Sequence, residues 1–213
     1  MARFAICFIF FVSILGLFSV KDRAFSASKT ETEQVETLNR QGISYRMQGN
    51  QEEAIKSFTK AIEIDPNDAE SYSHRGISFG SSSVHKFDLA MADFNKAIEL
   101  APNNGEYYFM RGLLYYQLED FENSWKDIEQ AGSLKYDLDK VADILKDVRG
   151  RCARYFNGRG LELFKDKEFD SAISYYDKAI EARSDVSLFY ANRANAYSAK
   201  KDYDRAMKDY KQA

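Results

Sequence analysis

Cysteine, proline and tryptophan are scarce in this sequence. Its 213 residues include two cysteines, two prolines and one tryptophan. Cys7 lies in an apolar N-terminal run and Cys152 is far from it in the chain. This separation excludes a disulfide framework and a cysteine-based zinc site, so Cys152 is most simply a small core residue. Cysteine usage therefore does not indicate a redox compartment.

Sequence motifs of catalysis are also absent. His74 and His85 stand in no HExxH or Cys/His arrangement. There is no GxSxG motif, no phosphate-binding glycine loop and no GxGxxG after a strand. The many carboxylates fall on polar helix faces, where solvated charge is the simple interpretation. The sequence therefore predicts a protein that is not an enzyme, with no catalytic residue, metal ligand or cofactor.

Charge of one sign is not concentrated anywhere. The chain carries 30 Lys and Arg against 33 Asp and Glu, a formal net charge of −3. Binding to nucleic acid or to an anionic membrane surface relies on clustered Lys and Arg, and this chain has no basic run. We therefore expect no nucleic-acid partner.

One long hydrophobic run is present, at residues 4–20, and it contains no charge. It is long for the core of a signal peptide and slightly short for a membrane span. Two interpretations stay open: residues 1–26 are an export signal cleaved after Ser26, or residues 4–20 are an uncleaved membrane anchor. In both cases the rest of the chain crosses a membrane and is periplasmic, extracytoplasmic or anchored by its N-terminus. Residues 27–34 are polar and predict a short flexible lead.

The remainder of the sequence repeats itself about every 34 residues, which is typical of a stacked helical array. Val35–Asp68 shows the pattern most completely. Its markers have the spacing of two short amphipathic helices that end at a proline: Leu38, Gly42, Tyr45, Ala54, Phe58, Ala61 and Pro66. Related units begin at Ala69, Gly105, Ala153 and Ser187.

The spacing Leu38-x2-Gln41-Gly42-x2-Tyr45, followed by Ala54-x3-Phe58 and then Pro66, resembles the tetratricopeptide repeat (TPR) family. The resemblance implies an all-α fold, a right-handed superhelical solenoid of antiparallel helix pairs. We expect about five units, the last incomplete. Units one to three occupy 35–138 and units four and five occupy 153–213. As a family tendency, the resemblance also implies peptide or protein binding.

Residues 139–152 fit none of the units. Apolar residues at helical spacing predict that this insertion is helical and extends into the fourth unit, with a possible bend at Gly150: Leu138, Val141, Leu145, Val148, Cys152 and Tyr155.

Comparison of the units predicts repeated ion pairs. Arginine precedes the glycine-type position, and aspartate precedes the large residue of the second helix, in three units. Because the two helices of a unit pack antiparallel, and a half-buried charge is rarely left without a partner, we expect Arg75–Asp93, Arg111–Asp127 and Arg193–Asp209 pairs rather than ligand anchors.

The second helices share a predicted N-cap. Asn50, Asp120 and Asp202 can each accept hydrogen bonds from free backbone N–H groups, and Asn50 with Glu53 has the spacing of a capping box.

The predicted partner-binding site is the concave side, which the first helix of each unit lines in such stacks. Its apolar and amide residues are Phe109, Leu113, Tyr116, Leu161, Phe164, Asn157 and Asn195. Exposed apolar and aromatic clusters are where protein partners anchor. The alternative is that the 139–152 insertion covers this stripe and buries it as core.

The function implied by these features is a non-catalytic scaffold that binds a peptide or protein partner in the concave groove, in the cell envelope. The two-carboxylate clamp of some relatives is not matched, because Asn157 and Leu161 stand where Lys and Asn are expected before Asn192. Two alternatives remain. The chain is a self-associating structural subunit that forms a homo-oligomer through its C-terminal end, or it is the N-terminal TPR fragment of a larger protein.

Overall fold

The computed structural model describes residues 30–81 and 83–213, and the secondary structure of these residues is entirely helical. They fall into two compact units that divide between Pro102 and Asn103. The predicted signal or anchor at 1–26, with the run at 4–20, lies outside the described residues. Among the residues described, no helix combines the length and the apolar character needed to cross a bilayer.

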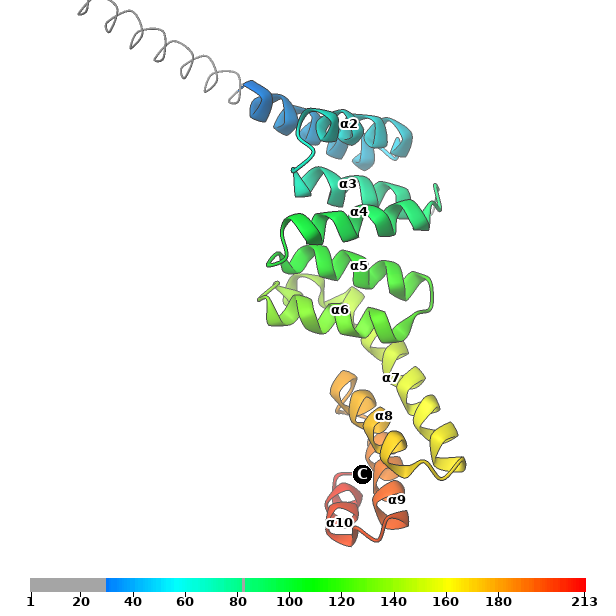
Figure 1. The fold of residues 1–213 in the computed structure, drawn as a ribbon. Helices are drawn as coiled ribbons and strands as arrows, with labels where there is room; N and C mark the ends of the chain where they lie inside the picture. Colours follow the sequence, from blue (N-terminus) through cyan, green and yellow to red (C-terminus); the bar gives the residue numbers. More distant parts are fainter. Residues whose placement is uncertain (1–29, 82) are drawn as a thin grey trace, which may run out of the picture. The chain divides into compact units, whose positions relative to one another are not determined.

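The N-terminal unit consists of two helical hairpins. A first helix at 30–47, which we call helix 30–47, pairs with α2 (Gln51–Ile64). The second hairpin joins α3 (Ala69–Gly80) to α4 (Phe87–Leu100), and α2 also packs on α3. Figure 1 shows the consecutive helices running back and forth. This arrangement is the predicted all-α helical repeat.

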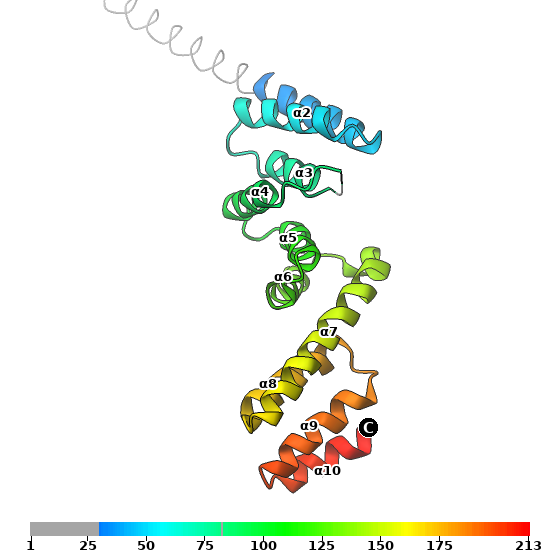
Figure 2. The same ribbon diagram turned by 90° about the vertical axis from the view of Figure 1, so that its right-hand side faces the viewer.

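The C-terminal unit contains three hairpins and the insertion. Its helices are α5 (Gly105–Gln117), α6 (Phe121–Ser133), the 3-10 turn η1 (Leu138–Val141), α7 (Ala142–Lys165), α8 (Phe169–Ala182), α9 (Ser187–Ala199) and α10 (Tyr203–Gln212). The long α7 joins most of the insertion to the first helix of the fourth repeat, and Gly150 lies within it. Figure 2 shows α7 as one continuous helix beside α8.

Small residues let the two helices of a repeat approach closely. A methyl group added to Gly42 would lie 2.5 Å from Cε1 of Phe58, and one added to Gly160 would lie 2.5 Å from Cε1 of Tyr176. Both rings are buried. The repeated glycine is therefore explained by packing, because no larger residue fits above the ring.

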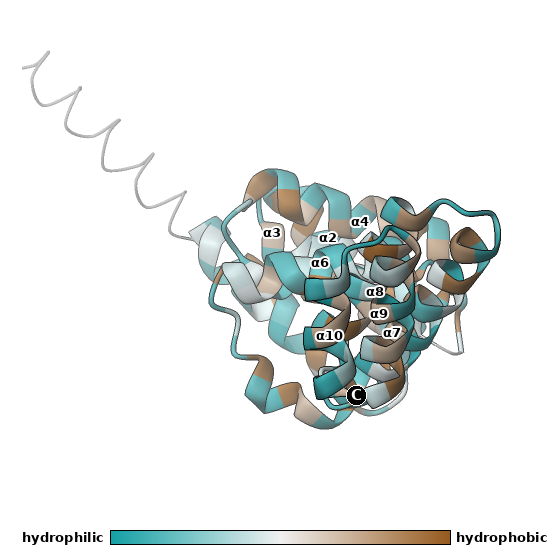
Figure 3. Cartoon of the chain, turned by 90° about the horizontal axis from the view of Figure 1, so that it is seen from below, coloured by the Kyte–Doolittle hydropathy of each residue, from teal (hydrophilic) through white to brown (hydrophobic). Residues whose placement is uncertain are grey.

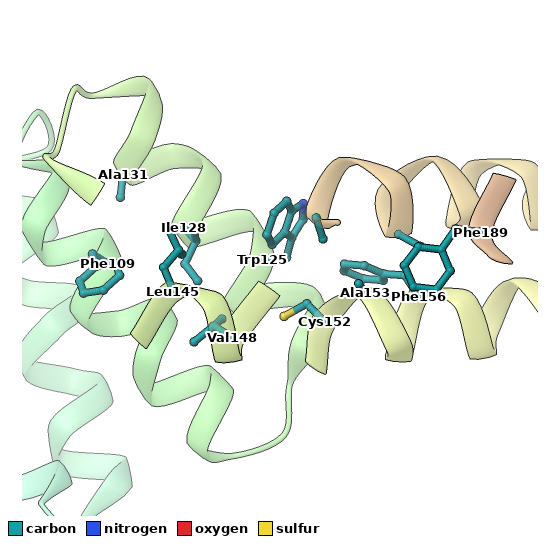
Figure 4. Close-up of a cluster of buried hydrophobic side chains, with 12 residues drawn as sticks. Phe109, Trp125, Ile128, Ala131, Leu145, Val148, Cys152, Ala153, Phe156 and Phe189 are labelled. Carbon is teal, nitrogen blue, oxygen red and sulfur yellow. The ribbon is translucent and has the colours of Figure 1, made fainter. Parts of the chain in front are cut away.

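The largest core cluster lies in the C-terminal unit and includes residues of the insertion. Leu145, Val148 and Cys152 of α7 pack with Ile128 and Trp125 of α6 (Figure 4). Each helix shown in Figure 3 carries both hydrophilic and hydrophobic residues, as burial of one face requires. The insertion is therefore part of the core rather than a surface loop.

The three predicted ion pairs are all present, and each is bidentate. In Arg75–Asp93 both N–O distances are 2.8 Å, in Arg111–Asp127 they are 2.7 and 2.9 Å, and in Arg193–Asp209 they are 2.7 and 2.8 Å. The hydrogen bonds to Asp127 raise the pKa of the Arg111 guanidinium, although burial opposes the shift. These charged side chains therefore pair with one another between the two helices of a repeat, as predicted.

Two of the three predicted N-caps are formed. Asp120 accepts from the backbone N–H of Asn123, and Asp202 accepts from that of Arg205. The capping prediction for Asn50 is wrong, because its side chain makes no cap hydrogen bond. Its predicted partner Glu53 instead accepts from the neighbouring lysine of α2, Lys56, at 2.6 Å.

Candidate partner-binding faces

The predicted groove divides into two groups of residues with different surroundings. Phe109, Leu113 and Tyr116 lie on α5, beside the core that includes the insertion. The other residues lie on the second half of α7 and on α9: Asn157, Leu161, Phe164 and Asn195.

The expectation that Phe109 is an exposed groove residue is wrong. Its side chain is 1% exposed and belongs to the buried core. The ring of Tyr136, from the connection between α6 and η1, lies 5.1 Å away centroid to centroid. Residues of the insertion, Leu145 among them, complete the same cluster. For Phe109 the alternative interpretation therefore holds, because the insertion and the connection before it bury this side chain.

Tyr116 is engaged by the insertion as well. Its hydroxyl donates to the carboxylate of Asp147, and the Arg151 guanidinium lies 5.0 Å from its ring centroid. Arg151 in turn donates to Glu119 at 2.8 Å. Burial, followed by the hydrogen bond to Asp147, raises the pKa of Tyr116. With Leu113 half-buried, the middle of the predicted groove offers little free apolar surface.

The second half of α7 and α9 form an accessible surface, which we call the C-terminal face. It consists of Arg154, Asn157, Leu161, Leu188, Asn192 and Asn195. Asn192 donates from its side-chain amide to Oδ1 of Asn157 at 2.8 Å, which ties the two helices together. The side chain of Asn157, which is predicted to line the groove, is itself buried.

Two leucines of this face are exposed. Leu161 is 38% exposed and Leu188 is 57% exposed. Asn195 is exposed and accepts a hydrogen bond from the Tyr210 hydroxyl at 2.7 Å. Exposed leucines next to positioned amides can hold a partner by apolar contact and by hydrogen bonds to its backbone.

Phe164 does not belong to this face. It is half-buried against the cluster of α8, α9 and α10, and its ring lies 5.4 Å from that of Phe169. Its place at the end of α7 gives it a packing role.

The N-terminal unit has a hollow of about 370 Å³, which we call the N-terminal recess. Helix 30–47, the segment leading into α3 and the first turn of α3 line it with Thr32, Val35, Glu36, Asn39, Arg40, Ile43, Asp65, Asp68 and Glu70. Four carboxylates and one guanidinium give it an acidic lining. Asn39 donates to Asp68 at 2.9 Å and accepts from the Ser71 hydroxyl at 2.7 Å, so its base is rigid.

Some functional candidates were missed by the sequence reasoning. Leu188 lies on the first helix of the fifth repeat, and first helices are predicted to line the concave side, so the repeat register alone could have identified it. Asp65 and Asp68 belong to the turn before α3, which lies outside the first helices that are predicted to line the concave side.

Two titratable groups of the C-terminal unit have a raised pKa. Burial raises the pKa of the Cys152 thiol to about 11, which makes it a poor nucleophile. Burial and the neighbouring Glu181 raise the pKa of Glu129. Within 30–81 and 83–213, no three His, Cys, Asp or Glu side chains are grouped so that they could hold a metal ion.

Comparison with known proteins gives related repeats along the chain. Residues 35–68, 85–104, 105–137 and 150–213 match tetratricopeptide repeat sequence families, and together these segments cover most of the chain. The Saccharomyces cerevisiae "Small glutamine-rich tetratricopeptide repeat-containing protein 2" is 38% identical over 55 residues, which are 26% of this chain and 16% of that relative. The chain thus matches a small part of the relative's length.

Solved structures share the fold. The first TPR domain of human RPAP3 is 26% identical, with a TM-score of 0.52, over 57% of this chain and 94% of that domain. The TPR2B domain of yeast Sti1, solved as a complex with pHsp70, is 22% identical, with a TM-score of 0.52, over 58% of this chain and 98% of that one. Proteins of this kind are typically non-catalytic interaction modules. From its repeats, its helical hairpins and these matches, the chain belongs to the tetratricopeptide repeat family.

Proposed function

We propose that the protein is a non-catalytic scaffold that binds a peptide or protein segment on the C-terminal face. The observation that carries the proposal is the pair of exposed leucines, Leu161 and Leu188, on two neighbouring first helices. The same two helices carry amides positioned by the Asn157–Asn192 hydrogen bond, each four residues along the helix from one of the leucines. A TPR fold supports the role of a protein-interaction scaffold, and it provides rigid helices for such a surface.

The chemistry of this face indicates what it would bind. Apolar side chains of the partner would pack on the two leucines, which are the anchors of the surface. Asn192 and Asn195 would exchange hydrogen bonds with the partner's backbone. Arg154 would favour an acidic side chain at one end. The N-terminal recess has the opposite character, and its carboxylates would favour a lysine or arginine.

Replacing the anchors should abolish capture on the C-terminal face. The double variant Leu161→Asp/Leu188→Asp places two charges where apolar contact is required, and we expect at least about a tenfold loss of partner affinity. Affinity capture from an envelope extract with quantitative mass spectrometry measures the loss. The matched control is Ile144→Asp, because Ile144 is 51% exposed on the first half of α7. Equal capture by both variants would remove the C-terminal face as the binding site.

We also propose that the protein is exported. The support is the uncharged run at 4–20, preceded by Arg3, with small residues before a cleavage point after Ser26. We expect intact-mass analysis of protein from the envelope fraction to place the mature N-terminus at Ala27. Uncleaved protein in the membrane fraction would favour the anchor, whereas uncleaved protein found in the cytoplasm would contradict export.

Self-association is the second candidate function, and α10 favours it. Three apolar or aromatic side chains of this helix are exposed: Tyr203, Met207 and Tyr210. They recur at i, i+4 and i+7, so they form one stripe on the helix. A soluble protein rarely leaves such a stripe uncovered. Light scattering over a range of concentrations tests this candidate, and a strict monomer would contradict it.

A further inference from the structure

The large residue in the middle of each second helix is buried in every repeat except the last. Phe58, Phe94, Ile128 and Tyr176 are at most 3% exposed, whereas the equivalent Tyr210 is 46% exposed. Met207 behaves in the same way: it is 57% exposed, and its equivalent in α8, Ile173, is 9% exposed and packs with Ala196 and Tyr197. Ala196 and Tyr197 belong to α9, the first helix of the following repeat.

Helix 30–47 leaves the complementary face uncovered. Thr37 and Ser44 are exposed, although their equivalents in α3, Ser71 and Ser78, are fully buried. The equivalents in α9, Phe189 and Ala196, are also buried. Ser71 and Ser78 show that small polar residues at these positions can be buried against another helix. The polarity of Thr37 and Ser44 therefore does not prevent another helix from packing on helix 30–47. The two end helices thus expose the two faces that meet at the α2–α3 and α8–α9 junctions.

A polar contact accompanies the packing at these junctions. The Arg75 guanidinium of α3 donates to the Thr59 hydroxyl of α2 at 3.2 Å. At the equivalent positions, the Arg193 guanidinium of α9 donates to Asp177 of α8 at 2.6 Å. In both cases the cation belongs to the first helix of the following repeat, and the acceptor belongs to the second helix of the preceding repeat.

Helix 30–47 and α10 depart from this pattern of cationic donor and acceptor. Lys211 of α10 occupies the acceptor position of Thr59 and Asp177, and Gln41 of helix 30–47 occupies the position of the arginines. Lys211 is the one cation among the five residues at the acceptor position, and Gln41 is the one uncharged residue among the five at the arginine position. A glutamine oxygen can accept from an ammonium group, whereas an arginine there would face a like charge.

We propose that helix 30–47 of a second copy of this chain packs antiparallel on the exposed stripe of α10, with the Gln41 side-chain oxygen accepting from the Lys211 ammonium. The proposal rests on the second candidate function, self-association, and names its two surfaces. Thr37 and Ser44 of one copy would cover Met207 and Tyr210 of the other, as α9 covers α8.

The departure of Gln41 and Lys211 from this pattern selects helix 30–47 among the first helices of the chain. Each of the other four carries arginine at the position of Gln41, so it would place a guanidinium against Lys211. The contact joins two different surfaces, so it is heterologous. Heterologous contacts leave one surface free at each end and either close into a ring or continue as a filament.

Cysteine cross-linking of the full chain tests the placement. Two variants, Gln41→Cys and Lys211→Cys, are prepared separately in a Cys7→Ser background; the remaining Cys152 is buried. Mixing them under mild oxidation should give a disulfide-linked heterodimer that neither variant gives alone. The control replaces the lysine variant by Lys208→Cys, since Lys208 is exposed on α10 but lies away from the stripe. Equal yields in mixture and control would overturn the proposal.

A charge exchange measured by sedimentation velocity tests the polar contact. Gln41→Arg should weaken self-association about tenfold, because two cations then face each other. Combining Gln41→Arg with Lys211→Glu should restore the association of the parent chain. Equal weakening in both variants would contradict the proposed contact. A strict monomer at all concentrations would contradict self-association itself, whereas oligomers without the cross-link would contradict only these surfaces.

Discussion

Replacing Asp127 by leucine is expected to lower the free energy of unfolding of the C-terminal unit by about 3–5 kcal/mol. Leucine keeps the shape of aspartate but removes its charge. The Arg111 guanidinium, whose side chain is 20% exposed, would lose both hydrogen bonds to that carboxylate. The cost arises because a largely buried cation is left without its compensating charge.

The double variant Arg111→Met/Asp127→Leu should recover most of this loss, to within about 2 kcal/mol of the parent. Urea unfolding followed by fluorescence measures both variants, since Trp125 is the single tryptophan of the chain and lies in the core of the same unit, on the same helix as Asp127. Lys126→Leu, at an exposed position of the same helix, serves as the control and should shift stability by about 0.5 kcal/mol or less. A double variant as unstable as Asp127→Leu would show that the pair itself is indispensable.

Phe156→Ala is expected to cost about 3–5 kcal/mol, because it removes a large ring from a fully buried position. Phe156 joins α7 to α6 of the preceding hairpin and to α8, its partner in the same hairpin. Its ring centroid lies 6.5 Å from that of Trp125 on α6 and 6.3 Å from that of Tyr175 on α8. The Lys178 ammonium lies 5.4 Å from the centroid as well.

The same fluorescence assay gives the result for Phe156→Ala. Leu161→Ala, five residues later on the same helix but exposed, should cost less than about 1 kcal/mol. Similar small losses for both variants would mean that α7 is not held by its buried ring, contrary to the described core.

The repeated features of the fold could be predicted because each position is sampled several times in one sequence. Arg111 and Asp127 recur at fixed places in other repeats, so their pairing follows from the antiparallel hairpin. The Asn50 cap failed because capping depends on the local turn, where Gly49 has a φ of 80° and the Asn50 side chain makes no cap hydrogen bond. A spacing rule does not specify that turn.

The exposure of Phe109 could not be predicted for a related reason. Whether a first-helix aromatic is free depends on what covers it, and the covering residue here, Tyr136, comes from a connection that does not repeat. The repeat pattern makes no prediction for such a segment. Leu188, in contrast, could have been found from the sequence, because it lies on a first helix and first helices are predicted to line the concave side. The boundaries of the repeats and the binding roles of Leu161 and Asn195 stay predictions.

Site-specific photo-crosslinking tests the proposed binding face most directly. A photoreactive residue is placed at Leu188 on the C-terminal face or, as the matched control, at Ile144 on the first half of α7; the two side chains are 57% and 51% exposed. We predict that a protein partner becomes attached at Leu188 and that Ile144 gives no comparable product. Attachment of the same partner equally at both positions, or only at Ile144, would contradict binding through the C-terminal face.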